Sequence, residues 1–183
     1  MYRRVTYNSR INSDDLIFYN NLNGDRGVDY IAPSQLTILS QKLKPNKSFY
    51  MYLTFMPTSG IIDDNLVIKI CDMNFSGIDF SVKKNGSFVI TGYNQTPIEC
   101  TPFFIDDSAG VGDTKLMNFS GIFEANGNNT YKLSNASFRL LKDINTIIAF
   151  GNINIESLAV NPSAAYVVVP NKIAFKTLII KYI

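Results

Sequence analysis

The residues best suited to bind a metal lie in one acidic, glycine-containing stretch, Asp106-Asp107-Ser108-Ala109-Gly110-Val111-Gly112-Asp113. Its carboxylates, Asp106, Asp107 and Asp113, could supply the hard oxygen ligands that calcium prefers. The spacing does not match an EF-hand loop, and the glycines are equally typical of a turn-rich surface segment. We therefore expect either a calcium-binding loop or an ordinary surface loop at this position.

Aromatic side chains form a second candidate site. Tyr50 and Tyr52 share one face of an expected strand, opposite Met51 and Leu53, because successive side chains alternate between the two faces of a strand. A tyrosine ring combines an apolar face with a polar tip, which suits it to stack on sugar rings or to anchor a protein interface. We expect Tyr50, Tyr52 and, further along the chain, Tyr93 to contact a glycan or a protein partner. The alternative is that Tyr50 and Tyr52 cover the second face of a sandwich.

The chain contains no histidine. Ser-His-Asp and Cys-His nucleophile systems are therefore excluded, and so are the common zinc sites, which need histidine or clustered cysteines. Cys71 and Cys100 are the only cysteines, and because no secretory signal is visible we expect free thiols. The chain also has no P-loop and no complete dinucleotide-binding glycine motif.

Glycoside hydrolysis stays chemically open, because it needs only two carboxyl groups about 5 to 9.5 Å apart. The acidic pairs Asp14-Asp15, Asp63-Asp64 and Asp106-Asp107 fall at expected turns or strand edges, where aspartate is favoured for local backbone hydrogen bonds. We therefore expect a protein that is not an enzyme and has no cofactor, calcium apart.

Period-two patterns from Phe49 onward predict the strands that position these residues. Apolar residues alternate with other residues in several runs, and the clearest runs cover residues 49–55, 66–71, 78–82, 138–141, 153–160 and 173–183. Lys84-Asn85-Gly86 and Asn126-Gly127 follow such runs and predict hairpins with type I′ turns. Near the N-terminus, Ser13-Asp14-Asp15 predicts a short helix to Tyr19, since serine caps and acidic first-turn residues favour helix starts.

One hexapeptide, Met73-Asn74-Phe75-Ser76-Gly77-Ile78, recurs letter for letter at residues 117–122. Identity over six residues in so short a chain predicts two equivalent strand-turn-strand units. On that interpretation Phe75 and Phe119 both lie in the core, while Gly77 and Gly121 lie at bulges or tight bends.

Many short strands separated by turn residues predict an all-β fold. We expect a single-domain, jelly-roll-like antiparallel β-sandwich over residues 31–183, with an extended N-terminal arm over residues 1–30. The arm is polar and contains Arg3, Arg4 and Arg10, which we expect to assist assembly with neighbouring subunits. An irregular first strand is an equally good interpretation of the same residues.

The charge balance limits the partners. Seventeen basic and 15 acidic residues give a net charge of +2, whereas nucleic-acid binding usually needs a concentrated basic face. No apolar run approaches the roughly 20 residues of a membrane-spanning helix. Without nucleic acid or membrane as a partner, we expect a chain that is made and assembled in a cytoplasm.

The favoured function is a non-enzymatic structural or adaptor protein of a large assembly, such as a decoration, collar or tail protein of a bacteriophage virion. Its partners would be copies of itself or other virion subunits. The abundance of isoleucine, asparagine, lysine, tyrosine and phenylalanine, whose codons are AT-rich, favours an AT-rich phage or bacterial genome. The alternative function is a carbohydrate-binding module for surface adsorption, assisted by calcium.

Overall fold

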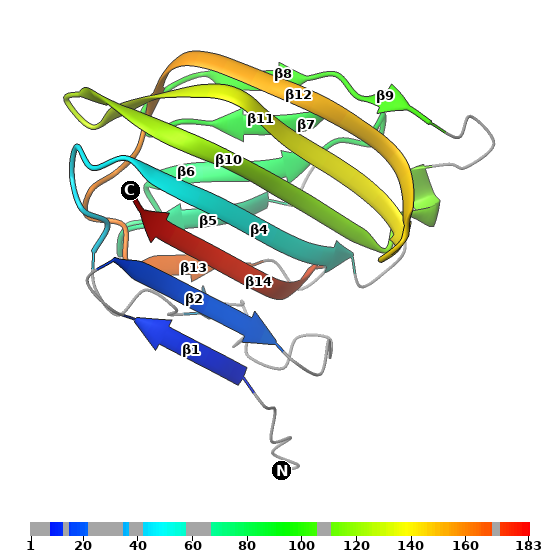
Figure 1. Ribbon diagram of the computed structural model, residues 1–183, viewed down its shortest axis with the longest axis horizontal. Helices are drawn as coiled ribbons and strands as arrows, with labels where there is room; N and C mark the ends of the chain where they lie inside the picture. Colours follow the sequence, from blue (N-terminus) through cyan, green and yellow to red (C-terminus); the bar gives the residue numbers. More distant parts are fainter. Residues whose placement is uncertain are drawn as a thin grey trace.

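The computed structural model describes residues 8–12, 15–21, 35–36, 42–57, 67–105, 111–169 and 173–183. Within these ranges the chain forms strands and one 3-10 turn, η1 (Val111–Asp113). The strands make two antiparallel sheets that lie face to face, as Figure 1 shows. The predicted all-β sandwich is therefore confirmed, while its jelly-roll winding stays a prediction.

The large sheet has eight strands. In spatial order they are β1 (Asn8–Asn12), β2 (Leu16–Asn21), β14 (Ile173–Tyr182), β4 (Phe49–Pro57), β10 (Leu116–Gly127), β11 (Thr130–Asp143), β12 (Thr146–Ala159) and β9 (Phe103–Phe104). The small sheet has six strands, in the order β3 (Gln35–Leu36), β13 (Tyr166–Val168), β5 (Val67–Cys71), β6 (Gly77–Val82), β7 (Phe88–Thr91) and β8 (Pro97–Cys100).

Aromatic side chains from both sheets meet in the core. Phe119 of the large sheet lies 5.3 Å from Phe80 and 5.9 Å from Phe88 of the small sheet, measured between ring centroids. Phe138 stacks on Phe88 at 5.1 Å. Burying one such ring contributes about 1.5 to 3 kcal/mol, so these contacts hold the two sheets together and leave the opposite face of each sheet to solvent.

Strand β4 confirms the predicted alternation. Phe49, Met51, Leu53 and Phe55 point into the core and are buried. The intervening residues, among them Tyr50 and Tyr52, therefore lie on the outer face of the large sheet.

The two copies of the repeated hexapeptide adopt different structures, so the prediction of equivalent units is wrong. The second copy lies in β10, with Phe119 fully buried. The first copy forms the turn between β5 and β6, where Phe75 is 52% exposed and has a φ of 60°. Phe75 is therefore not a core residue, although Phe119 is.

The residue before each copy accounts for the difference. Asp72 precedes the first copy, and its Oδ1 accepts hydrogen bonds from the backbone N–H groups of Asn74 (2.8 Å) and Ser76 (3.1 Å). Such local bonds favour a turn over a strand. Leu116 precedes the second copy and offers no acceptor, so that copy continues as a strand.

The two hairpin turns differ in detail from the prediction. The turn after β6 closes with a bond from the Gly86 N–H to the Lys83 oxygen, and only Gly86 in it has a positive φ, 86°. It is therefore not the predicted type I′ turn. The β10–β11 turn has positive φ at both Asn128 and Asn129 (54° and 56°), as a type I′ turn requires, but it lies two residues beyond the predicted position.

The predicted bulge is confirmed at Gly121, whereas Gly77 is a regularly paired residue of β6. The β10–β11 register shifts between Ser120 and Phe123, which places Gly121 at a bulge. Gly77 follows the β5–β6 turn, and a Cβ there would overlap the Ile70 carbonyl oxygen of the neighbouring strand. Gly77 thus needs the small residue for close backbone approach, whereas a Cβ at Gly121 would meet the Ala136 side chain.

The N-terminal region contributes a hairpin to the large sheet. β1 pairs with β2, and β2 pairs with β14, so the predicted helix from Ser13 to Tyr19 is wrong where the structure describes it. Ile17 and Tyr19 are fully buried in the core, a gain that outweighs the weak helix-start signal. Part of the predicted arm is thus sheet. Arg10 lies opposite Tyr19 in β1, while Arg3 and Arg4 lie outside the described residues.

Candidate functional site

A row of polar residues crosses the outer face of the large sheet. Register partners in neighbouring strands follow one another in the order Arg139, Asn118, Thr54, Thr177 and Asn20. Residues directly opposite in antiparallel strands present their side chains on the same face. We call these five residues the polar row; at one end of it the Thr177 hydroxyl donates to Asn20 Oδ1 at 3.0 Å.

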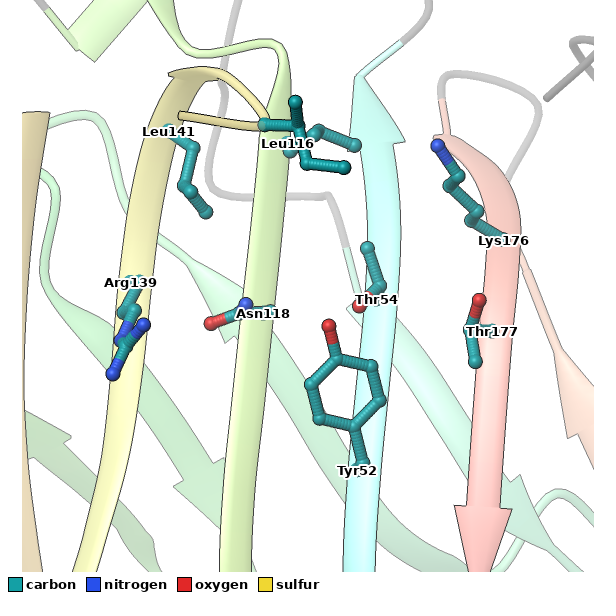
Figure 2. A pocket seen from close by; sticks show the side chains of 9 residues that line it. Tyr52, Thr54, Leu116, Asn118, Arg139, Leu141, Lys176 and Thr177 are labelled. Carbon is teal, nitrogen blue, oxygen red and sulfur yellow. The ribbon is translucent and has the colours of Figure 1, made fainter. Parts of the chain in front are cut away.

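A surface cavity of about 270 Å³ lies over the centre of the polar row. Its walls come from β4, β10, β11 and β14 and from the β11–β12 turn. The lining residues are Tyr52, Thr54, Leu116, Asn118, Arg139, Leu141, Ile144, Lys176 and Thr177. Figure 2 shows eight of these side chains with their labels, the polar ones side by side across the four strands.

Thr54 is the unusual member of this set. It stands on the outer face between Asn118 and Thr177, yet it is only 7% exposed. Its Oγ1 is buried and has no hydrogen-bond partner, which costs about 1 to 3 kcal/mol. Threonine suits strands, but strand preference does not explain an unsatisfied hydroxyl in a cavity wall. A polar atom of a ligand would satisfy it once Thr54 or a side chain that covers the hydroxyl changes its rotamer.

Tyr52 supplies the aromatic surface of the cavity. In Figure 2 its hydroxyl points towards the level of Asn118 and Thr54. Tyr50 stands two residues away on the same face, where burial, and secondly the neighbouring Tyr52 phenol, raise the pKa of Tyr50. The cavity therefore combines one aromatic ring with hydroxyl and amide groups, a combination that can stack on and hydrogen-bond to a polyhydroxylated ligand.

Two cations lie at opposite sides of the cavity. Arg139 belongs to β11 and Lys176 to β14, with β10 and β4 between them. Three strand spacings separate the backbones, or roughly 14 Å at about 4.8 Å per spacing. No aspartate or glutamate is among the lining residues, so the site is electropositive.

The structure brings only part of the sequence-predicted aromatic site together. Tyr52 lines the cavity and Tyr50 is its neighbour on the same face. Tyr93 instead lies in the turn between β7 and β8, where its N–H donates to the Ala159 oxygen at 2.9 Å. Tyr93 is not among the residues that line the cavity.

Sequence reasoning missed the polar partners of Tyr52. The alternation that paired Tyr50 with Tyr52 also places Thr54 on their face, so this residue could have been found. Asn118, Arg139 and Thr177 could not, because only the register of β10, β11 and β14 brings them beside β4.

The predicted calcium loop lies mostly outside the described residues, which exclude Asp106 and Asp107. Asp113 ends η1 and is exposed. Within the described ranges, no cluster of three or more Cys, Asp or Glu side chains could hold a metal ion. Calcium binding at residues 106–113 stays a prediction.

The two cysteines are free, as predicted. Burial raises the pKa of Cys71 to about 11 and also raises the pKa of Cys100. Both thiols are therefore protonated and weakly reactive at neutral pH, and neither lines the cavity.

No protein-family model matches the chain, and a search of curated proteins finds no significant relative. None of the helical structure in the described ranges is long and apolar enough to cross a membrane.

Proposed function

We propose that this chain is a carbohydrate-binding module that holds a glycan on the outer face of the large sheet. The observation that carries the proposal is the buried, unpartnered hydroxyl of Thr54, which sits in a cavity wall beside Tyr52 and Asn118. A sugar ring offers an apolar face to a tyrosine ring and hydroxyl groups to the polar row.

Each side chain makes a different contact with the sugar. The Tyr52 ring stacks on the sugar, and the Asn118 amide donates one hydrogen bond and accepts another. The Thr54 hydroxyl gains its missing partner, and Thr177, which already donates to Asn20, accepts from a sugar hydroxyl. The cavity volume of about 270 Å³ lies near the lower end of the roughly 300 to 1,000 Å³ found for small-molecule sites. It therefore suits a short part of a longer glycan chain.

The test is retention of the purified chain on a panel of immobilised polysaccharides, followed by calorimetric titration with the best oligosaccharide. Tyr52→Ala is expected to weaken binding about tenfold, since an aromatic stacking contact is worth about 0.5 to 1.5 kcal/mol beyond its burial. Tyr93→Ala is the matched control, because Tyr93 lies outside the cavity, and it is expected to bind as the unaltered chain does. Blank panels, or equal losses from both variants, would contradict the proposal.

The second candidate function is a structural role in a large assembly such as a bacteriophage virion. It is favoured by the apolar edge at β9, where Phe103 and Ile105 are exposed and the Phe103 ring lies 5.7 Å from Phe150. β9 is the last strand of the large sheet, and exposed apolar groups at a sheet edge are typical of protein contacts.

Sedimentation over a wide range of concentrations tests this second candidate. It predicts a defined oligomer that Phe103→Glu dissociates, because a carboxylate in an apolar contact is costly to bury. A monomer at every concentration would count against self-assembly. The two surfaces adjoin, because Phe103 pairs with Phe150 and Phe150 pairs with Arg139 of the cavity. A contact at β9 would therefore lie two strand spacings, or roughly 10 Å, from the edge of the cavity.

A further inference from the structure

The cavity has two positively charged side chains in its lining, which binding of a neutral glycan does not require. Both charged side chains that line it, Arg139 and Lys176, are cationic. Some other lysines of the described residues have acidic partners, as in Lys69–Asp79 and Lys83–Glu99, each at 2.9 Å. Within the same described ranges, neither Arg139 nor Lys176 has an acidic partner.

The two cations are also placed to act on one ligand. Arg139 is at the end of the polar row, in direct register with Asn118, and Lys176 adjoins Thr177, which is in register with Thr54. The neutral hydrogen-bonding groups therefore lie between two positive charges. Figure 2 shows Arg139 and Lys176 on opposite sides of Tyr52 and Thr54.

An arginine guanidinium donates two parallel hydrogen bonds to a carboxylate, sulfate or phosphate group, and lysine adds a compact positive charge. Thr54 Oγ1 and the Asn118 amide can donate to the same anionic group or to neighbouring hydroxyls. A neutral glycan would leave both cations without a partner. Moreover, a cavity with no carboxylate in its lining has nothing to repel an anion.

We propose that the cavity selects an acidic glycan, whose anionic group binds Arg139 and whose chain runs across the strands towards Lys176. This inference rests on the proposed carbohydrate-binding function and specifies the class of its ligand. Carboxylate, sulfate and phosphate share the chemistry that the cavity recognises, so the source of the negative charge is an outcome of the test.

The experiment compares matched oligosaccharides in calorimetric titrations at low salt. The pairs are an oligouronate and its carboxyl-reduced neutral form, a sulfated oligosaccharide and its desulfated form, and a phosphorylated oligosaccharide and its dephosphorylated form. At least one acidic member is expected to bind tenfold or more tightly than its neutral form. Its affinity should fall as salt rises, and the pair that shows the effect identifies the anion.

Variants of the two cations localise the effect. Arg139→Gln and Lys176→Gln are each expected to weaken binding of the acidic oligosaccharide several-fold more than they weaken binding of its neutral form. Lys142→Gln is the matched control, because Lys142 is an exposed cation of β11 that does not line the cavity. Near-UV circular dichroism verifies that each variant keeps the native packing.

The outcomes separate this inference from the function on which it rests. If neutral oligosaccharides bind as tightly as the acidic ones, and Tyr52→Ala weakens both, the cavity is a glycan site but does not select acids. If no oligosaccharide binds, the carbohydrate-binding function itself fails. Acid selectivity that survives Arg139→Gln and Lys176→Gln would place the anion elsewhere and overturn the inference.

Discussion

The repeated hexapeptide permits one substitution in two environments. Phe75→Ala and Phe119→Ala remove the same atoms from the same six-residue sequence, so effects on the unfolded chain largely cancel. The folded environments differ. Phe119 is fully buried against Phe80, Phe88 and Phe123, whereas Phe75 is 52% exposed.

The expected costs follow from these environments. Truncating a buried phenylalanine lowers the free energy of unfolding by about 3 to 5 kcal/mol, because burial is lost and a cavity remains. A phenylalanine that is half exposed has about half of the 1.5 to 3 kcal/mol of full burial to lose, or about 1 kcal/mol. Alanine is no better than phenylalanine at the positive φ of residue 75, so Phe75→Ala releases no strain. Phe119→Ala should therefore cost about 2 to 4 kcal/mol more than Phe75→Ala.

Urea unfolding followed by far-UV circular dichroism measures the difference. With a slope of about 1 to 3 kcal/mol per molar urea, the two midpoints should differ by roughly 1 M or more. Met73→Ala and Met117→Ala repeat the comparison, since Met73 is exposed and Met117 is fully buried. Equal costs for Phe75→Ala and Phe119→Ala would refute the assignment of one copy to a turn and the other to the core.

Three further predictions concern stability. Thr54→Val replaces an unpartnered buried hydroxyl with a methyl group and should raise the free energy of unfolding by about 1 to 2 kcal/mol. The same variant should bind glycan more weakly in calorimetry. A lower free energy of unfolding would mean that the hydroxyl has a hydrogen-bond partner in the folded chain. Phe75→Gly should have a free energy of unfolding about 1 kcal/mol higher than Phe75→Ala, because both variants lose the same ring and glycine alone has no penalty at a φ of 60°. A urea midpoint below that of Phe75→Ala would contradict this reasoning. Hydrogen bonds from the Ser76 N–H first, and then from Asn74 and Asn161, lower the pKa of Asp72 below its ordinary 3.8. Ionised Asp72 therefore stabilises the fold above pH 3.8. This stabilisation is lost as the pH falls through the lowered pKa of the folded state. Asp72→Asn should accordingly be less stable than the unaltered chain at pH 7 and approach it in acid, and a stability difference that does not change with pH would exclude this role.

The alternation of residue types was enough to predict several of the strands from Phe49 onward, but it did not predict β1 and β2. In β4 the sequence Phe49 to Phe55 has an apolar residue at every second position, and those residues are the buried ones. Such a pattern is local and is enforced by burial of one face, so it can be read without knowing the neighbouring strands. The same pattern correctly placed Tyr50 and Tyr52 on the outer face.

Identical hexapeptides did not predict identical structures, because the residues that flank them differ. Met73 to Ile78 and Met117 to Ile122 are identical, yet Asp72 holds the first copy in a turn through its carboxylate. Burial of Ile17 and Tyr19 likewise favours a strand over the helix that Ser13 predicted. In both regions a tertiary or capping contact outweighed the weaker local preference.

The polar row could not have been predicted, because its members are distant in sequence. Asn20, Thr54, Asn118, Arg139 and Thr177 come from five different strands, and only the register of the large sheet aligns them. A shift of one residue in any of these strands would turn its side chain to the opposite face. The site is thus a property of strand pairing and not of a motif.

Glycan binding by the polar row can be tested directly. The most direct measurement is an NMR titration of the isotope-labelled chain with the oligosaccharide that binds best in the acidic and neutral panel. The account predicts that amide shifts concentrate at Tyr52, Thr54, Asn118, Arg139 and Thr177, while Tyr93 and the 72–76 turn stay unchanged. Amide shifts that change at β9 or at the 72–76 turn, with no change in the polar row, would contradict glycan binding at the polar row.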